Sequence, residues 1–128
     1  MDGSDFRSCD MEEADIRGSS FKGANFSHAS MKIVNASPLL FGEGGPTRRF
    51  SPCDFSGATM RYADLSGGRL KSANFRGVDL SYADLSGADL READFTGAIM
   101  KDTNLEGAQT DDAIMDKTDT PVFRIPSE

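Results

Sequence analysis

The apolar positions between Cys53 and Lys117 recur every five residues without a break. Each repeat has a central residue, here called the centre, and a small residue stands two positions before it. The centres are Phe55, Met60, Leu65, Leu70, Phe75, Leu80, Leu85, Leu90, Phe95, Met100, Leu105, Thr110 and Met115. A period of five fits neither an α-helix, near 3.6, nor a strand, near 2. It indicates a solenoid, in which each repeat buries its centre only by stacking on neighbouring repeats.

A second period of twenty residues appears in the same stretch and near the N-terminus. Phe55, Phe75 and Phe95 lie twenty apart, as do Phe6 and Phe26. The N-terminal centres are Phe6, Met11, Ile16, Phe21, Phe26, Met31 and Ala36. The longer period predicts four repeats per coil, with like side chains stacked in the core. Glycine recurs every ten residues from Gly57 to Gly107, which predicts that alternate corners of the coil turn differently.

The pattern fails between Val34 and Cys53, where the sequence reads VNASPLLFGEGGPTRRFSPC, and its phase slips by one residue. If Phe50 is a centre that follows Ala36, the interruption is one repeat plus about nine extra residues, near Leu39–Thr47. This arithmetic predicts one continuous helix of about five coils. It stacks Phe26 directly on Phe55 and Phe21 on Phe50.

The segment YADLSGADLREADFTGA resembles the A(D/N)LXX signature of the pentapeptide-repeat family, and the likeness extends over about residues 4–117. The resemblance implies an all-β fold, a right-handed quadrilateral β-helix. In that fold the centre and the small residue face inward and the other three positions face outward. We therefore expect a repeat domain at 4–117, interrupted by a loop at about 37–49, and a C-terminal tail or cap at 118–128.

The formal net charge of −7 argues against a direct nucleic-acid partner on electrostatic grounds. No apolar run approaches membrane-spanning length, and we expect no secretory or transit segment before the repeats. We expect a soluble, cytoplasmic protein, with the thylakoid lumen as the alternative. The recurrent Asp or Asn before each centre follows the family rule. His28 has no ligand cluster around it, so no catalytic residue, cofactor or metal site is expected.

Cys9 and Cys53 both occupy the small, inward position of a repeat. We expect them on different faces and about two coils apart, beyond the Cα–Cα reach of a disulfide, about 7 Å. Both are therefore predicted to be reduced thiols that react slowly, because burial disfavours the thiolate.

Two features depart from the repeat rule and are the candidate binding residues. Ile33, Tyr62 and Tyr82 are predicted to form an outward apolar stripe. The inserted loop carries Leu39, Leu40 and Phe41 as candidate apolar anchors, and Arg48 and Arg49 as orienting groups. We expect stripe and loop to form one partner-binding surface. In the alternative, the loop is a structural lid over the stripe.

These features predict a non-enzymatic protein-interaction or scaffolding domain with a protein partner. Its layout resembles the repeats of BTB/POZ-type ubiquitin-ligase adaptors, which implies a part of a larger protein. A second hypothesis is a DNA-mimicking protein that binds type II topoisomerase, as in the quinolone-resistance branch of the family, which the acidic composition favours. A third is a thylakoid-lumen protein of the same family.

Overall fold

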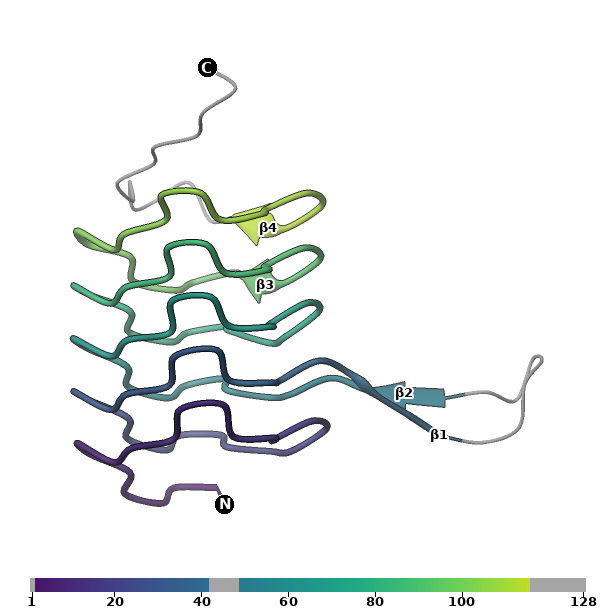
Figure 1. Cartoon of the computed structure of the whole chain (residues 1–128), viewed down its shortest axis with the longest axis horizontal. Coiled ribbons are helices and arrows are strands. Elements are labelled where there is room, and N and C mark those ends of the chain that lie inside the picture. The colour runs from purple at the N-terminus through teal and green to yellow at the C-terminus, as the bar shows by residue number, and fades with distance from the viewer. Residues whose placement is uncertain (1, 42–48, 116–128) are drawn as a thin grey trace.

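The computed structural model describes residues 2–41 and 49–115, which form a stack of coils with one projecting ribbon (Figure 1). The ribbon consists of β1 (Leu39–Phe41) and β2 (Arg49–Ser51), which pair antiparallel. Near the other end of the stack, β3 (Asp94–Phe95) pairs parallel with β4 (Ile114–Met115). The remaining coils are joined by isolated parallel bridges, such as Asp54↔Asn74 and Asp64↔Asp84. The periods of five and twenty thus correspond to an all-β solenoid.

Each centre whose following residues are described, except Ala36, which precedes the ribbon, is followed by a tight turn, here called a corner. The N–H of the next small residue donates to the carbonyl of the centre, as in Ala58 to Phe55 (2.9 Å) and Ala63 to Met60 (3.1 Å). The residue two after the centre has a positive φ, the signature of a type II turn. A turn comes every five residues, and each parallel bridge that does not span the insertion joins residues twenty positions apart in successive coils. Four corners therefore complete a coil.

The glycine rhythm does not mark two kinds of backbone turn. Gly57 has a φ of 72° and Tyr62, at the following corner, has a φ of 62°. The prediction that alternate corners turn differently is therefore wrong for the sign of φ. The alternation instead decides which corners carry a side chain. At those corners a non-glycine residue adopts the left-handed conformation at an energetic cost.

Where an Asp or Asn stands directly before a centre, it has a structural role. Its Oδ1 accepts a hydrogen bond from the N–H two residues later, as from Ser56 to Asp54 (2.9 Å) and from Arg76 to Asn74 (3.0 Å). Only one carboxyl or amide oxygen is needed, so Asp and Asn serve equally. This local bond explains why the repeat tolerates both residues at this position.

The register across the interruption differs from the sequence-based arithmetic. The bridges Ser20↔Asp54 and Asn25↔Thr59 join residues 34 apart, where 20 is the usual offset, so the insertion has fourteen residues. Phe55 stacks on Phe21, with centroids 5.6 Å apart and planes 9° apart, and meets Phe26 edge-on at 74°. The predicted Phe26–Phe55 stack is therefore wrong.

The reason for the error is Phe50. It lies in β2 opposite Leu40, so it is a ribbon residue and not a centre. The four core columns follow from the bridges, and they are Phe6–Phe26–Met60–Leu80–Met100, Met11–Met31–Leu65–Leu85–Leu105, Ile16–Ala36–Leu70–Leu90–Thr110, and Phe21–Phe55–Phe75–Phe95–Met115.

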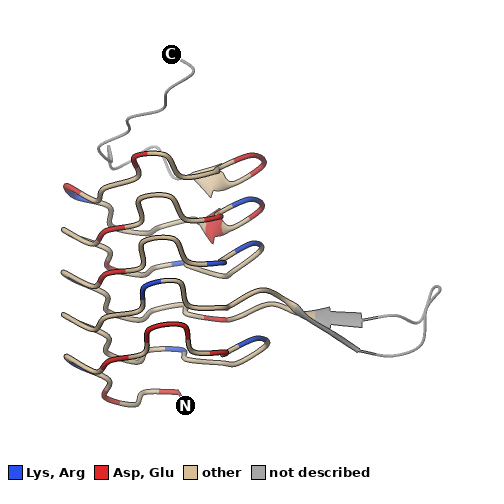
Figure 2. Cartoon of the chain, in the orientation of Figure 1, with Lys and Arg blue, Asp and Glu red and all other residues tan. Residues whose placement is uncertain are grey.

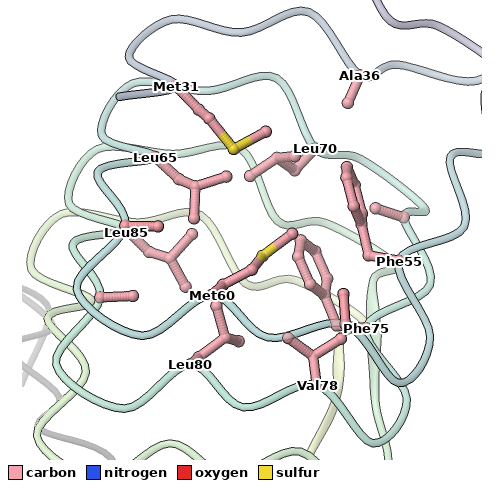
Figure 3. Close-up of a cluster of buried hydrophobic side chains, with 14 of the residues drawn as sticks. Met31, Ala36, Phe55, Met60, Leu65, Leu70, Phe75, Val78, Leu80 and Leu85 are labelled. Atoms are coloured by element: carbon pink, nitrogen blue, oxygen red, sulfur yellow. The ribbon is translucent and has the colours of Figure 1, made fainter. Parts of the chain in front are cut away.

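The columns fill the interior of the coils with apolar side chains. In Figure 3, Met31, Leu65 and Leu85 follow one another in one column, and Phe75 lies beside Phe55. The phenylalanine stack continues from Phe75 to Phe95 with centroids 4.9 Å apart and planes 4° apart. Among the described residues, no buried side-chain nitrogen or oxygen lacks a hydrogen-bond partner. The core is thus a largely apolar rod, in which the buried Thr103 hydroxyl donates to the Leu80 carbonyl (2.7 Å).

Phe75→Ala is expected to lower the free energy of unfolding by about 3–5 kcal/mol, because a fully buried ring between two others leaves a cavity. Urea denaturation measures the change. The control is Phe6→Ala, which removes a partly buried ring and should cost clearly less. Equal losses would contradict the stacking scheme.

Asp84→Asn is expected to leave stability unchanged or slightly higher. Asn keeps the Oδ1 acceptor for the N–H of Ser86 (2.9 Å) and removes the charge facing the bridged Asp64. Asp84→Ala loses that acceptor and should cost about 1 kcal/mol. Thermal melts of the two variants decide, and a substantial loss for Asn would show that the carboxylate charge itself is needed.

Candidate protein-interaction surfaces

The described parts of the insertion, 39–41 and 49–51, pair as a two-stranded ribbon. The register Leu39↔Ser51 places Pro38 opposite Pro52 at the body end of β1 and β2. Proline has no N–H to donate, so the ladder cannot continue toward the coils. From this point the ribbon extends away from the body (Figure 1). Of the predicted loop residues, Leu39–Phe41 and Arg49 lie in the two strands, and Arg48 lies outside the described residues.

The outward aromatic stripe contains Tyr62 and Tyr82, as predicted, but its third member is His28. The Tyr62 and Tyr82 rings are 5.0 Å apart and 9° from parallel, and His28 stacks below Tyr62 at 4.9 Å and 4°. We call these three residues the aromatic column. Sequence reasoning assigned His28 no role because the assumed insertion was five residues too short.

Ile33 lies at the next corner along the coil, outside the aromatic column. Its N–H donates to the carbonyl of Ser66 (3.0 Å), and its side chain lies next to Gly67. It is 56% exposed and has a φ of 56°. The predicted stripe of Ile33, Tyr62 and Tyr82 is therefore wrong in its first member.

The ribbon and the aromatic column occupy opposite corners of the coil. The ribbon replaces the corner after Ala36, whereas the aromatic column stands at the corners after Phe26, Met60 and Leu80. Each coil has four corners, and the ribbon lies two corner steps away from the aromatic column. The expectation that loop and stripe form one surface is wrong, and β1 and β2 do not cover the stripe.

Two cations accompany the aromatic column. The Arg61 guanidinium and the Lys101 ammonium each lie 5.9 Å from the centroid of Tyr82, within cation–π range. Arg61 also donates to the Asp79 carboxylate (3.3 Å). Partial burial acts to raise the pKa of Asp79, but hydrogen bonds from Ser81 and Arg61 outweigh it, so the pKa lies below its usual value. Asp79 therefore stays ionised and fixes Arg61 beside the ring.

The aromatic column is built on strained backbone. His28, Tyr62 and Tyr82 each have a φ of 62°. A left-handed conformation costs an L-residue about 1–2 kcal/mol, and glycine would avoid this cost. The same positive φ occurs at the other non-glycine corners, such as Ser72 and Glu92, so this strain belongs to the turn and does not by itself mark the column as functional.

Elsewhere several charged side chains pair with a residue two positions away in the same repeat, as Arg7 does with Asp5 and Arg91 with Asp89. Asp and Glu recur along the coils with Lys and Arg between them (Figure 2). Hydrogen bonds from Arg7 lower the pKa of Asp5 to about 2, and Arg91 lowers that of Asp89 in the same way. No group of three or more His, Cys, Asp or Glu among residues 2–41 and 49–115 could hold a metal ion. In the same ranges no helix is long and apolar enough to cross a membrane.

The two cysteines are free thiols in different environments. Cys53 is buried, burial raises its pKa, and its Sγ–H donates to the Ile16 carbonyl (2.9 Å). Cys9 is exposed, so the prediction of an inaccessible thiol is wrong for it. Cys9 lies in the first of the described coils, and none of the described coils covers its small-residue position from the N-terminal side.

Comparisons with known proteins agree with this architecture. A family model of pentapeptide repeats matches residues 1–32, 49–77 and 73–109. HetL, a pentapeptide repeat protein involved in heterocyst differentiation regulation in the cyanobacterium Nostoc sp. strain PCC 7120, is 33% identical with a TM-score of 0.54. The match covers 81% of this chain and 39% of HetL, so the chain spans about two fifths of the length of that protein.

Two further solved structures are more distant. Rfr23 from the cyanobacterium Cyanothece 51142 is 25% identical, with a TM-score of 0.39 and coverage of 76% of this chain and 64% of Rfr23. A thylakoid-lumen pentapeptide repeat protein from Arabidopsis thaliana is 24% identical, with a TM-score of 0.32 and coverage of 95% and 67%. No curated protein matches the sequence.

The family model covers more than half of the residues, and the repeat, the turns and the bridges account for its pattern position by position. The chain therefore belongs to the family of pentapeptide-repeat proteins.

Proposed function

We propose that this chain is a non-enzymatic protein-interaction domain, in which the coils are a rigid support and the β1–β2 ribbon contacts a protein partner. One observation carries the proposal. The fourteen inserted residues leave the ladder intact on both sides, because Ala36 still donates to Arg69 (2.8 Å) and Asp54 to Ser19 (3.0 Å). The ribbon is thus an addition to a complete support.

A projecting two-stranded ribbon is suited to recognition. Two strands alone are marginally stable in water, and a partner that adds a strand or covers one side would stabilise them. In this proposal Leu39, Leu40 and Phe41 supply apolar contacts, and Arg48 and Arg49 orient the partner. These roles are hypotheses that rest on the sequence.

The biological setting is part of the proposal. Within a larger cytoplasmic protein, such as a BTB/POZ-type ubiquitin-ligase adaptor, the domain would present a substrate or a regulator. HetL is involved in regulating differentiation, and a regulatory role exerted through protein contacts is compatible with the present geometry. A location in the thylakoid lumen is the alternative setting.

The net charge of −7 favours a second candidate, a DNA-mimicking protein that binds type II topoisomerase. The two candidates differ in how the affinity for the partner depends on salt concentration. Binding dominated by an acidic surface should weaken steeply with ionic strength, whereas binding through an apolar ribbon should change little.

Replacing Ser37–Pro52 with Ser-Gly is expected to leave the thermal melt nearly unchanged, because the replacement restores a two-residue corner like the others and loop length contributes little to stability. Binding to a partner isolated with the intact domain should be lost, as measured by titration of the purified components. Lys71-Ser72→Ser-Gly, at the same corner one coil on, is the matched control and should bind normally.

Two results would overturn the proposal. If the shortened protein unfolds, the ribbon is a structural part of the coils. If it folds and binds its partner with unchanged affinity, the partner contacts another surface.

A further inference from the structure

The aromatic column presents ring edges and hydroxyls to solvent, not ring faces. His28, Tyr62 and Tyr82 are nearly parallel, so each inner face is covered by the next ring. Tyr62 is nevertheless 50% exposed. A partner that lies along the column therefore meets a row of aromatic edges, spaced by one coil.

The two tyrosine hydroxyls are available as hydrogen-bond donors. Neither the Tyr62 nor the Tyr82 hydroxyl has a hydrogen-bond partner within residues 2–41 and 49–115. A partner with exposed backbone carbonyls can accept from both. An α-helix cannot offer such carbonyls along its length because its own N–H groups use them.

Positive charge stands beside the rings. Lys101 has no acidic partner within 4.0 Å in the described part of the chain, and Arg61 forms an ion pair with Asp79 (3.3 Å). Arg7 lies in the same outward position two coils from Arg61 and pairs with Asp5 (2.7 Å). Asp102, next to Lys101, is the one acid at the column's own turn position. An incoming carboxylate thus finds Lys101 unpaired.

The spacing of this row matches one kind of backbone. Two coil steps of 4.9 and 5.0 Å, measured between ring centroids, add up to roughly 10 Å, and two coil steps separate Arg61 from Lys101 along the solenoid axis. A polyproline II helix repeats its side-chain direction every three residues, or about 9.3 Å, and its carbonyls are free of internal hydrogen bonds. A β-strand repeats on one face every two residues, about 6.7 Å, and falls out of step.

From these observations we infer that the aromatic column, with Arg61 and Lys101, binds an acidic, proline-rich segment of a partner protein that lies along the solenoid axis in the polyproline II conformation. Its carboxylates, one every three residues, pair with Lys101 and Arg61, which lie two coils apart, and a carbonyl between them accepts from a tyrosine hydroxyl. The site lies at the corner opposite the ribbon, so it would be a second binding surface, independent of the first.

The probe is a fluorescein-labelled peptide of four Glu-Pro-Pro units, followed by fluorescence anisotropy with the full chain. We expect saturable binding with a Kd below about 1 mM, weakened by salt. A Lys-Pro-Pro peptide tests the charge, and a Glu-Gly-Gly peptide tests the preformed conformation. Each should bind at least about tenfold more weakly.

The variants are chosen to preserve the fold. Tyr62→Gly removes a ring at a position where glycine relieves strain, and Lys101→Glu reverses the unpaired cation. Each should weaken peptide binding about tenfold or more. Ser72→Gly, at the same backbone position of another corner with a φ of 63°, is the matched control and should not change it. Thermal melts confirm that all three are folded.

Several outcomes overturn the inference: no binding up to millimolar peptide, equal binding of the lysine or glycine peptide, or unchanged affinity in folded Tyr62→Gly protein. The ribbon-shortened protein should bind the peptide as the intact chain does. Its result separates this proposal from the ribbon proposal, because either surface can fail alone.

Discussion

The parallel backbone ladder between coils is the interaction on which the whole molecule depends. Each coil supplies donors and acceptors to the next at a fixed offset, as where Phe55 donates to Asn74 (2.8 Å) and Asn74 to Cys53 (2.9 Å). This register places like centres over one another and so creates the core columns. It also places His28, Tyr62 and Tyr82 in a row, so the ladder that builds the core sets the spacing of the surface as well.

Much of the fold could be predicted from the sequence because its information is local and repeated. The five-residue phrase specifies which side chain faces inward, and the twenty-residue period specifies the number of corners. The register across residues 37–52 could not be obtained this way. Phe50 has the right character for a centre, and the choice between nine and fourteen inserted residues depends on its pairing with Leu40 in the ribbon, which the repeat pattern does not indicate.

The predicted composition of the candidate surface depended directly on this register. The alignment of Tyr62 with Tyr82 could be predicted because both follow the insertion, so their relative register does not depend on its length. Ile33 and His28 precede it, so an error of five residues exchanged one for the other. The exposure of Cys9 depends on the absence of a covering coil among the described residues, which the repeat pattern cannot indicate.

The bond from each Asp or Asn oxygen to the N–H two residues on uses an acceptor and is indifferent to charge. Surface potential is therefore decoupled from folding in this architecture. Exchange of aspartate and asparagine at these positions, by drift or selection, can change the charge of each face of the rod from acidic to neutral. The backbone of the coil stays the same. A solenoid of this kind can present very different electrostatic surfaces to its surroundings on an almost invariant frame.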